Sequence, residues 1–285
     1  MKKRFFILFC FLLVIYIIFV IFGRHIETIL TFPGMYISSD SNNIQSFKKI
    51  YDIKEVTFDS YEDNTGSGIF INNDEDYTIL FYLPNGVNIS NFISDIAWFG
   101  NQGYNVAAMD YPGYGKSQGW PSEENVYKST QNFYNYLIND KNISSENIIV
   151  GGYSIGSAPA INIAEKNEVK SLFLISPFNS RNGMSEFIYG IPIQKYLFLE
   201  DSFKNYKKIQ KVTVPTLIMH GKQDKVVPWE MGKEILENSG ADNKKFLLLE
   251  EYDHNTMFFA LEDVFDKYIN DFILHEDKED EFVVY

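Results

Sequence analysis

The chain has 285 residues, 45% of them hydrophobic, and a formal net charge of −13. This length and apolar content can build one sizeable core with at most a small accessory region, so we expect a single folded domain. The negative charge disfavours nucleic acid as a partner and gives no electrostatic attraction to an anionic membrane surface. Part of the acidity is concentrated at the end of the chain, where residues 275–285 are predicted to form a solvated acidic tail.

The N-terminal part of the chain is apolar and carries no charge from Phe5 to Phe22. As a helix it would reach roughly 27 Å, close to the thickness of the hydrocarbon core of a bilayer. No small-x-small cleavage pattern follows, so residues 1–25 are predicted to form an uncleaved membrane anchor rather than a signal peptide. Three basic residues precede the apolar segment. The positive-inside rule then places the N-terminus in the cytoplasm and the folded domain on the exoplasmic side, periplasmic or extracellular.

The anchor is followed by residues 26–54, which have no regular pattern of apolar positions. They include Pro33-Gly34 and a cluster of Ser, Asn and Asp at residues 38–43. We interpret them as a connecting segment that packs on the domain surface. The only cysteine, Cys10, lies within the apolar N-terminal segment, so the folded domain can hold no internal disulfide and no cysteine-based metal site.

Segments typical of strands and helices alternate between residues 55 and 274. Residues 55–60 and 68–71 flank a polar turn and predict an antiparallel hairpin. Further strands are predicted at residues 77–83, 104–110, 147–152, 170–175, 213–220 and 245–250, and helices at residues 91–103, 122–139 and 258–274. Alternation of this kind implies right-handed crossovers and a parallel sheet covered on both faces. The prediction is therefore an α/β domain with a mostly parallel, eight-stranded sheet flanked by helices.

The motif that organises the predicted site is the turn Gly152-Tyr153-Ser154-Ile155-Gly156, between a β-branched run and a helical pattern of small residues. Glycine-flanked serines are common in ordinary turns. A Gly-x-Ser-x-Gly sequence between a strand and a helix, however, is the form of a nucleophile elbow, in which the glycines let other backbone segments pass close to a strained serine. The next helix points its positive N-terminus at any negative charge that develops beside the serine. Ser154 is the predicted nucleophile.

An acid and a base follow Ser154 in the order that such an elbow requires. Asp224 comes directly after the strand at residues 213–220. A carboxylate placed there can accept a hydrogen bond from a histidine and stabilise the imidazolium that forms during acyl transfer. His254 lies in the loop after the last predicted strand. Ser154, Asp224 and His254 are therefore the predicted catalytic residues.

Other candidates for the acid and the base fit less well. His25 adjoins the apolar segment and His275 lies in the acidic tail. His220 ends the strand that already supplies the acid, so we expect it to line the loop. Asp253 is the sequence neighbour of the predicted base and should point elsewhere, while Asp110 begins a tight turn. Asp224 itself could still be an ordinary turn residue.

Acyl transfer also needs hydrogen-bond donors for the oxyanion. These are normally the backbone amide after the nucleophile and a second amide from the loop after the third strand. We predict the amides of Ile155 and Asn85. Pro84, which precedes Asn85, has no amide hydrogen to donate.

Residues 177–211 interrupt the alternation of strands and helices. They carry several large apolar side chains, and Gly190 and Pro192 break the pattern. The segment lies where folds of this kind insert a cap, and its shortness predicts a small flap over an open pocket. A pair of helices that merely covers the edge of the sheet is the alternative.

With these residues in place, residues 55–274 resemble the α/β-hydrolase superfamily. More narrowly, they resemble the single-pass membrane serine hydrolases of the abhydrolase-domain type, related to the serine aminopeptidase-like group. Besides the three predicted catalytic residues, the resemblance rests on Asp-Tyr-Pro-Gly-Tyr-Gly-Lys-Ser-Gln-Gly at residues 110–119, on Ser176-Pro177-Phe178, and on His-Gly-Lys-Gln-Asp at residues 220–224. It implies an α/β-hydrolase fold in which residues 110–119 shape a turn beside the active site.

The chain departs from these relatives at two places. Relatives usually carry His-Gly-Asn where this chain has Leu83-Pro84-Asn85, and they tend to have Tyr-Arg-Gly where it has Tyr111-Pro112-Gly113. The first departure lies in the loop that should supply an oxyanion donor. Neither departure removes a predicted catalytic side chain.

The predicted function is hydrolysis of a carboxylic ester or thioester through an acyl-enzyme, without a metal or an organic cofactor. The anchor and the apolar flap favour a small-molecule or lipid-like acyl substrate. Two alternatives stay open. One is a serine peptidase of aminopeptidase type, for which the insert at residues 177–211 is short, and the other is a catalytically silent interaction module. The sequence gives no indication of the oligomeric state.

Overall fold

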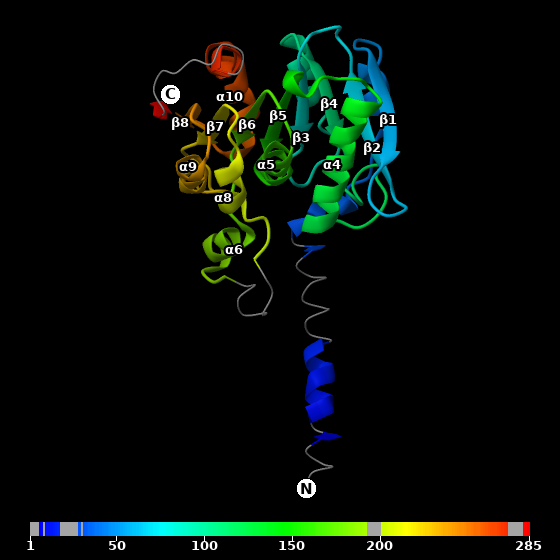
Figure 1. Ribbon diagram of the computed structural model, residues 1–285, viewed down its shortest axis with the longest axis vertical. Coiled ribbons are helices and arrows are strands. Elements are labelled where there is room, and N and C mark those ends of the chain that lie inside the picture. Colours follow the sequence, from blue (N-terminus) through cyan, green and yellow to red (C-terminus); the bar gives the residue numbers. More distant parts are fainter. Residues whose placement is uncertain (1–5, 8, 18–27, 30, 193–200, 273–281) are drawn as a thin grey trace.

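The computed structural model describes the chain except for residues 1–5, 8, 18–27, 30, 193–200 and 273–281 (Figure 1). Its centre is a sheet of nine strands in the order β1-β2-β4-β3-β5-β6-β7-β8-β9, one strand more than the eight expected. The strands are β1 (Ile53–Asp59), β2 (Thr65–Ile71), β3 (Thr78–Tyr82), β4 (Asn105–Met109), β5 (Ile148–Tyr153), β6 (Ser171–Ile175), β7 (Thr216–Gly221), β8 (Lys244–Leu249) and β9 (Phe282–Val284).

The direction and order of the strands confirm the predicted fold. β1 and β2 form the expected antiparallel hairpin, β2 is antiparallel to β4, and all later neighbours in the sheet are parallel. β3 and β5 are buried along their whole length, as expected for parallel strands that are covered on both faces. A mostly parallel sheet with an antiparallel β2 and the crossing of β3 and β4 is the α/β-hydrolase fold.

Helices cover both faces of the sheet (Figure 1). On one face α4, α5, α8 and α9 pack against one another in sequence. On the other face α3 meets the C-terminal helix through aromatic pairs such as Trp98 and Phe265, whose ring centroids are 4.9 Å apart. The helices are α2 (Ser41–Phe47), α3 (Ile93–Asn101), α4 (Glu123–Asn139), α5 (Ser157–Lys166), α6 (Arg181–Tyr189), α8 (Asn205–Lys208), α9 (Trp229–Asn238) and α10 (Met257–Val264), the last continuing as a π-helix (Phe265–Asn270).

The N-terminal apolar segment is helical at residues 6, 7 and 9–17. It projects away from the rest of the molecule in Figure 1, and its large apolar side chains are exposed. Phe5, Leu8 and residues 18–22, which complete the predicted membrane helix, lie outside the described residues. In the part of the chain that the structure describes, none of the helices has both the length and the apolar character needed to cross a membrane.

The connecting segment contains a helix that the sequence pattern did not predict. α2 begins after Asp40, whose side chain accepts a hydrogen bond from the amide of Asn42, a standard N-cap contact. We call residues 31–43 the N-terminal strap because they are fastened to the loop after β3. The Asp40 amide donates to Ser90 Oγ at 2.9 Å, and Asn88 Nδ2 donates to the carbonyl of Ile37 at 3.2 Å.

The predicted cap region includes α6 and α8, while residues 193–200 between them lie outside the described residues. α6 ends at Gly190, which takes the left-handed conformation (φ 72°) usual for a C-terminal cap. Near this end Phe187, Ile188 and Tyr189 are exposed. These side chains give the described part of the insert an apolar surface.

The ninth strand comes from the segment that was predicted to be a solvated tail. β9 pairs in parallel with β8, and Phe282 stacks on Phe246 with ring centroids 5.3 Å apart. The backbone of Tyr285 extends the pairing through hydrogen bonds with Leu248 and Glu250. β9 therefore covers the edge that β8 would otherwise expose.

Candidate active site

The predicted nucleophile lies at the sharp turn between β5 and α5. Ser154 has a φ of +54°, a left-handed conformation that is uncommon for residues other than glycine. Two neighbouring glycines make room for this turn. A Cβ atom on Gly152 would lie 2.3 Å from the carbonyl oxygen of Gly156, and one on Gly156 would lie 2.2 Å from that of Tyr82 at the end of β3. The segment thus has the geometry of a nucleophile elbow.

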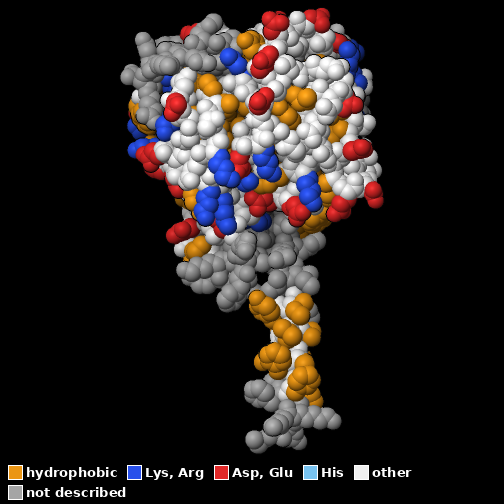
Figure 2. All heavy atoms as spheres, viewed as in Figure 1, with side chains coloured by type: hydrophobic (Ala, Val, Ile, Leu, Met, Phe, Trp, Pro, Cys, Tyr) orange, Lys and Arg blue, Asp and Glu red, His pale blue; other side chains and the backbone are white. Residues whose placement is uncertain are grey.

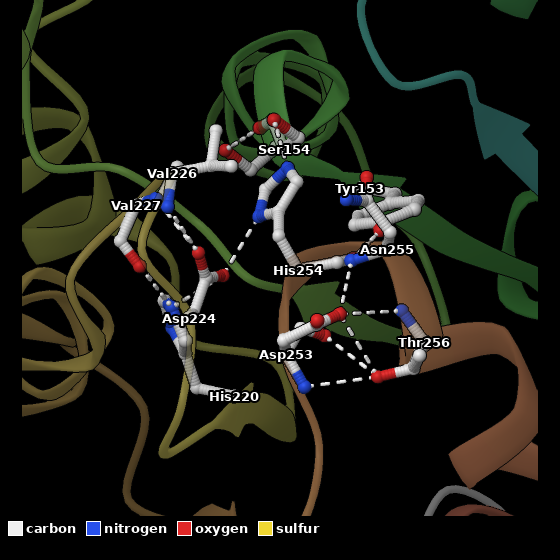
Figure 3. Close-up of polar contacts among 11 residues, drawn as sticks. Tyr153, Ser154, His220, Asp224, Val226, Val227, Asp253, His254, Asn255 and Thr256 are labelled. Carbon is white, nitrogen blue, oxygen red and sulfur yellow. Dashed lines mark hydrogen bonds and ion pairs between the residues drawn. The ribbon is translucent and has the colours of Figure 1, made fainter.

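Three side chains from three strand ends meet at this turn (Figure 3). His254 begins a 3₁₀ turn (His254–Thr256) after β8, and its Nε2 lies 3.1 Å from Ser154 Oγ. Its Nδ1 lies 2.7 Å from Oδ2 of Asp224, which follows β7. The sequence predicted these residues as a set, and the structure brings them within hydrogen-bonding distance of one another. Such an arrangement can transfer a proton from a serine hydroxyl to a histidine that a carboxylate orients.

Asp224 is held by hydrogen bonds to both of its carboxylate oxygens. Its Oδ1 accepts from the amides of Val226 and Val227 at 2.9 and 2.8 Å. Burial raises the pKa of this carboxyl, but hydrogen bonds from His220, His254 and the Val227 amide outweigh burial and leave the pKa below its usual value. Asp224 is therefore ionised at neutral pH and acts only as an acceptor toward His254.

The loop that carries His254 is fixed on both sides of this residue. Asp253 does not approach the imidazole: its carboxylate accepts from the amides of Asn255 and Thr256 and caps the 3₁₀ turn (Figure 3). The hydroxyl of Tyr153, in the elbow, donates to the carbonyl of His254. Asp253 thus points elsewhere, as expected, and Tyr153 joins the nucleophile turn to the base loop, a contact the sequence analysis missed.

The predicted oxyanion loop begins beside the elbow, where the carbonyl oxygen of Leu83 lies 2.7 Å from the position of a Cβ on Gly156. Leu83, which starts this loop, is held through its carbonyl by the hydroxyl of Tyr111 at 2.8 Å. The side chain of Asn85 is held from two directions. Its Oδ1 accepts from Tyr114 Oη at 3.0 Å, and its Nδ2 donates to the carbonyl of Thr31 in the N-terminal strap at 2.7 Å. The roles of the Asn85 and Ile155 amides as oxyanion donors stay predictions.

The substitution Asn85→Asp tests the oxyanion prediction. It keeps the acceptor for Tyr114 but places an anionic oxygen against the Thr31 carbonyl, so the loop must shift. We expect kcat for ester hydrolysis to fall by about 10²-fold with little change in KM, because an oxyanion donor acts mainly in the transition state. Asn101→Asp is the matched control, since Asn101 Oδ1 also accepts from a tyrosine, Tyr51, at an exposed position. Equal kcat values for the two variants would contradict the prediction.

Asp110 shapes a turn beside the site and does not contact the three catalytic candidates. Its Oδ1 accepts from the amide of Ile89 at 2.8 Å and its Oδ2 from the amide of Lys116 at 3.0 Å. Burial raises the pKa of this carboxyl to about 6, although both amide bonds oppose the shift. The role is structural, as the resemblance implied, because the carboxylate ties the loop after β3 to the turn after β4.

The raised pKa of Asp110 predicts a pH-dependent contribution to stability. The folded state holds this proton more tightly than the unfolded state, whose carboxyl has a pKa of about 3.9. Stability from this group is therefore present below about pH 4 and is lost as the pH rises through about 6. Asparagine does not titrate. The difference in unfolding free energy between Asp110→Asn and the wild type should therefore change in favour of the variant by on the order of 3 kcal/mol as the pH rises from 4 to 7. Urea denaturation of both proteins measures this difference, and a pH-independent difference would contradict it.

His220 makes a second contact that the sequence analysis missed, this one with the predicted acid. Its imidazole is buried and lies against Asp224, with 3.3 Å between Nε2 and Oδ2 (Figure 3). The sequence analysis placed it in the loop lining. Its spacing of four residues from Asp224 across a strand end was the available signal, because a turn there brings the two side chains together.

Comparison with known protein families agrees with the fold. Residues 86–201 match a family described as alpha/beta hydrolase fold, and residues 196–259 match a family described as serine aminopeptidase, S33. The two matches together include all three catalytic candidates. Fold and side-chain arrangement thus define an α/β-hydrolase-fold protein with serine, histidine and aspartate at the elbow.

The chain is similar in sequence to human alpha/beta hydrolase domain-containing protein 17B, with 35% identity over 162 residues, 56% of this chain and 54% of that protein. Protein 17C of Xenopus tropicalis is 34% identical over the same length, 51% of its own. The aligned part spans about half of each of these relatives. Among solved structures, the Pyrococcus furiosus esterase Pf2001 has a TM-score of 0.67 at 19% identity, covering 80% of this chain and 95% of the esterase. An alpha-beta hydrolase from Vibrio vulnificus has a TM-score of 0.67 at 21% identity, covering 81% and 86%.

Proposed function

We propose that this chain is a serine hydrolase that cleaves carboxylic esters or thioesters. The observation that carries the proposal is the continuous contact from Ser154 Oγ through the imidazole of His254 to the carboxylate of Asp224, with the serine on a strained elbow. An ordinary glycine-flanked turn has no need of a buried histidine and a buried carboxylate in line with its hydroxyl. The similarity to an esterase of the same fold is consistent with the proposal.

In the proposed reaction, His254 Nε2 takes the proton of Ser154 as its oxygen attacks the carbonyl carbon of the substrate. Asp224 accepts from Nδ1, fixes the tautomer and stabilises the imidazolium. The tetrahedral oxyanion accepts hydrogen bonds from the amides of Ile155 and Asn85. His254 then protonates the leaving alcohol or thiol, and the acyl group stays on Ser154. Water, deprotonated by His254, attacks the acyl-enzyme and releases the acid.

We propose a lipid-like or acylated substrate and attachment to a membrane through the N-terminal helix. Two exposed apolar surfaces support this part. One is the N-terminal helix at residues 6, 7 and 9–17, whose hydrophobic side chains are drawn in orange in Figure 2, and the other is the end of α6. A protein in water rarely exposes contiguous apolar surface without a partner for it. Carbonate extraction of cell membranes tests the attachment: release of the full chain at high pH would overturn it.

The proposed chemistry is tested with a fluorophosphonate probe, which labels an activated serine covalently. We expect the wild-type chain to be labelled at Ser154 and Ser154→Ala to remain unlabelled. Ser157→Ala is the matched control. Its hydroxyl is buried and donates to the carbonyl of Ser154 at 2.6 Å, so it is near the site but has no base beside it. A folded wild-type chain that does not react would contradict the proposal and favour the alternative of a catalytically silent interaction module.

A serine peptidase is the second candidate, favoured by the match of residues 196–259 to the serine aminopeptidase family. Peptide and ester bonds can be compared directly with p-nitrophenyl esters of graded chain length and the corresponding amino-acid anilides. The ester proposal expects turnover of esters, with kcat/KM that rises with acyl chain length. Turnover of anilides alone would favour the peptidase instead.

A further inference from the structure

His220 is buried in β7, and its two ring nitrogens have very different surroundings. Nε2 lies 2.9 Å from the carbonyl oxygen of Val227 and 3.3 Å from Oδ2 of Asp224. Nδ1 is also buried but makes no hydrogen bond to any described residue. A Cβ atom on Gly232, in α9, would lie only 2.5 Å from this nitrogen. Both the turn after β7 and α9 therefore pack directly on the ring.

These surroundings fix the position of the ring proton. Both neighbours of Nε2 are acceptors, a carbonyl and a carboxylate, so Nε2 carries hydrogen. A second proton on Nδ1 would create a buried donor without an acceptor, which is unfavourable. The ring N–H is therefore on Nε2, which donates to the Val227 carbonyl and lies 3.3 Å from Asp224 Oδ2. The charged group that the structure places against it is Asp224.

Asp224 Oδ2 is consequently approached by two histidines at once. His254 Nδ1 donates at 2.7 Å and His220 Nε2 approaches at 3.3 Å, while Oδ1 is occupied by two backbone amides. His220 cannot serve as a base itself. Asp224 and His254 lie between His220 and Ser154, and Nε2 of His220 already donates to the Val227 carbonyl (Figure 3).

We infer that His220 is a positioning residue for the reaction: its Nε2–H holds the Asp224 carboxylate in the orientation in which Oδ2 faces His254. This inference rests on the proposed serine hydrolase chemistry and deepens it. Without the His220 donor, Oδ2 has only His254 as a side-chain partner. The carboxylate would then bind the imidazolium more strongly in the resting enzyme and would rotate more freely about its Cβ–Cγ bond.

The test compares His220→Leu with His220→Gln in the full-length chain. Leucine removes the donor, whereas the amide nitrogen of glutamine can replace Nε2–H. With a p-nitrophenyl ester as substrate, we expect His220→Leu to lower kcat about tenfold or more with KM nearly unchanged. We also expect the acidic limb of its kcat/KM profile to move to higher pH by several tenths of a unit, because the imidazolium is held more tightly. His220→Gln should restore most of the rate and the original profile.

Gly232→Ala provides a second test that replaces none of the side chains of the site. The added methyl group would push on Nδ1 of His220, and alanine does not weaken α9 because it favours helix over glycine. This variant should shift the profile in the same direction as His220→Leu. It decides the question if His220→Leu does not fold, which near-ultraviolet circular dichroism would reveal.

The outcomes separate this inference from the proposed function. A wild-type chain that neither reacts with fluorophosphonate nor hydrolyses the ester defeats the proposed function itself. An active wild type with unchanged kcat and an unshifted profile in both His220→Leu and Gly232→Ala overturns only the positioning role. Equal losses in His220→Leu and His220→Gln, with the profile unmoved, also overturn it, because they indicate a purely structural histidine.

Discussion

Asp224→Asn is expected to lower kcat for ester hydrolysis by about 10⁴-fold while the domain stays folded. Asparagine will keep its oxygen toward the amides of Val226 and Val227, because these are donors. Its NH₂ group then faces His254 Nδ1 and forces the opposite tautomer. In that tautomer Nε2 carries the proton and cannot accept one from Ser154. Steady-state kinetics with a p-nitrophenyl ester measures the loss.

Asp253→Asn is the matched control for this prediction. Asp253 is the other acid beside the base, but its carboxylate caps the 3₁₀ turn, and an asparagine oxygen can accept the same two amide bonds. We expect this variant to retain kcat within about threefold of the wild type, since surface caps of this kind mainly affect local stability. If Asp253→Asn lost as much activity as Asp224→Asn, the assignment of the acid would be wrong.

Gly156→Ala should prevent normal folding of the elbow or destabilise the domain by several kcal/mol. The backbone of Gly156 is in an ordinary helical conformation (φ −63°), so the reason is space and not conformation. Its Cβ would lie 2.2 Å from the Tyr82 carbonyl oxygen and 2.7 Å from that of Leu83. These are backbone atoms at the end of β3 and the start of the loop after it, and they cannot move aside as a side chain would. Thermal unfolding and fluorophosphonate labelling would both report the change.

Gly190→Ala supplies the contrasting case. Gly190 has a left-handed conformation (φ 72°), but nothing lies within 4 Å of the position of its Cβ. The expected loss is only about 1 kcal/mol, the usual penalty for a residue other than glycine in that conformation, and labelling should be normal. A Gly156→Ala protein as stable as Gly190→Ala would show that the elbow has more room than the structure indicates.

The predicted strands, the elbow and the order of its partners were readable from the sequence because each rests on local patterns. Ser154 stands between glycines after a β-branched run, and Asp224 and His254 each follow an apolar run that ends in a polar loop. The carboxyl ends of parallel strands share one edge of the sheet. Local patterns and this single topological fact were enough to bring the three residues together.

The parts that were missed depend on contacts between distant segments or on weak local signals. β9 has three residues, and although Phe282, Val283 and Val284 favour strands, so short a run is too weak a signal without the β8 edge on which it pairs. The bond from Tyr153 to the His254 carbonyl joins residues 101 positions apart. α2 could have been anticipated from its Asp40 cap, but it has only seven residues and a short apolar face.

The N-terminal strap has a mechanical consequence for the candidate active site. From Thr31 onward the chain is bonded to the loop that carries Asn85 and to Arg181 of α6, whose Nη2 donates to Thr31 Oγ1 at 2.8 Å. The strap and the loop that carries Asn85 therefore form one bonded unit. A displacement of the strap would be transmitted to this loop, and with it to the predicted oxyanion donor, through the bond from Asn85 to Thr31.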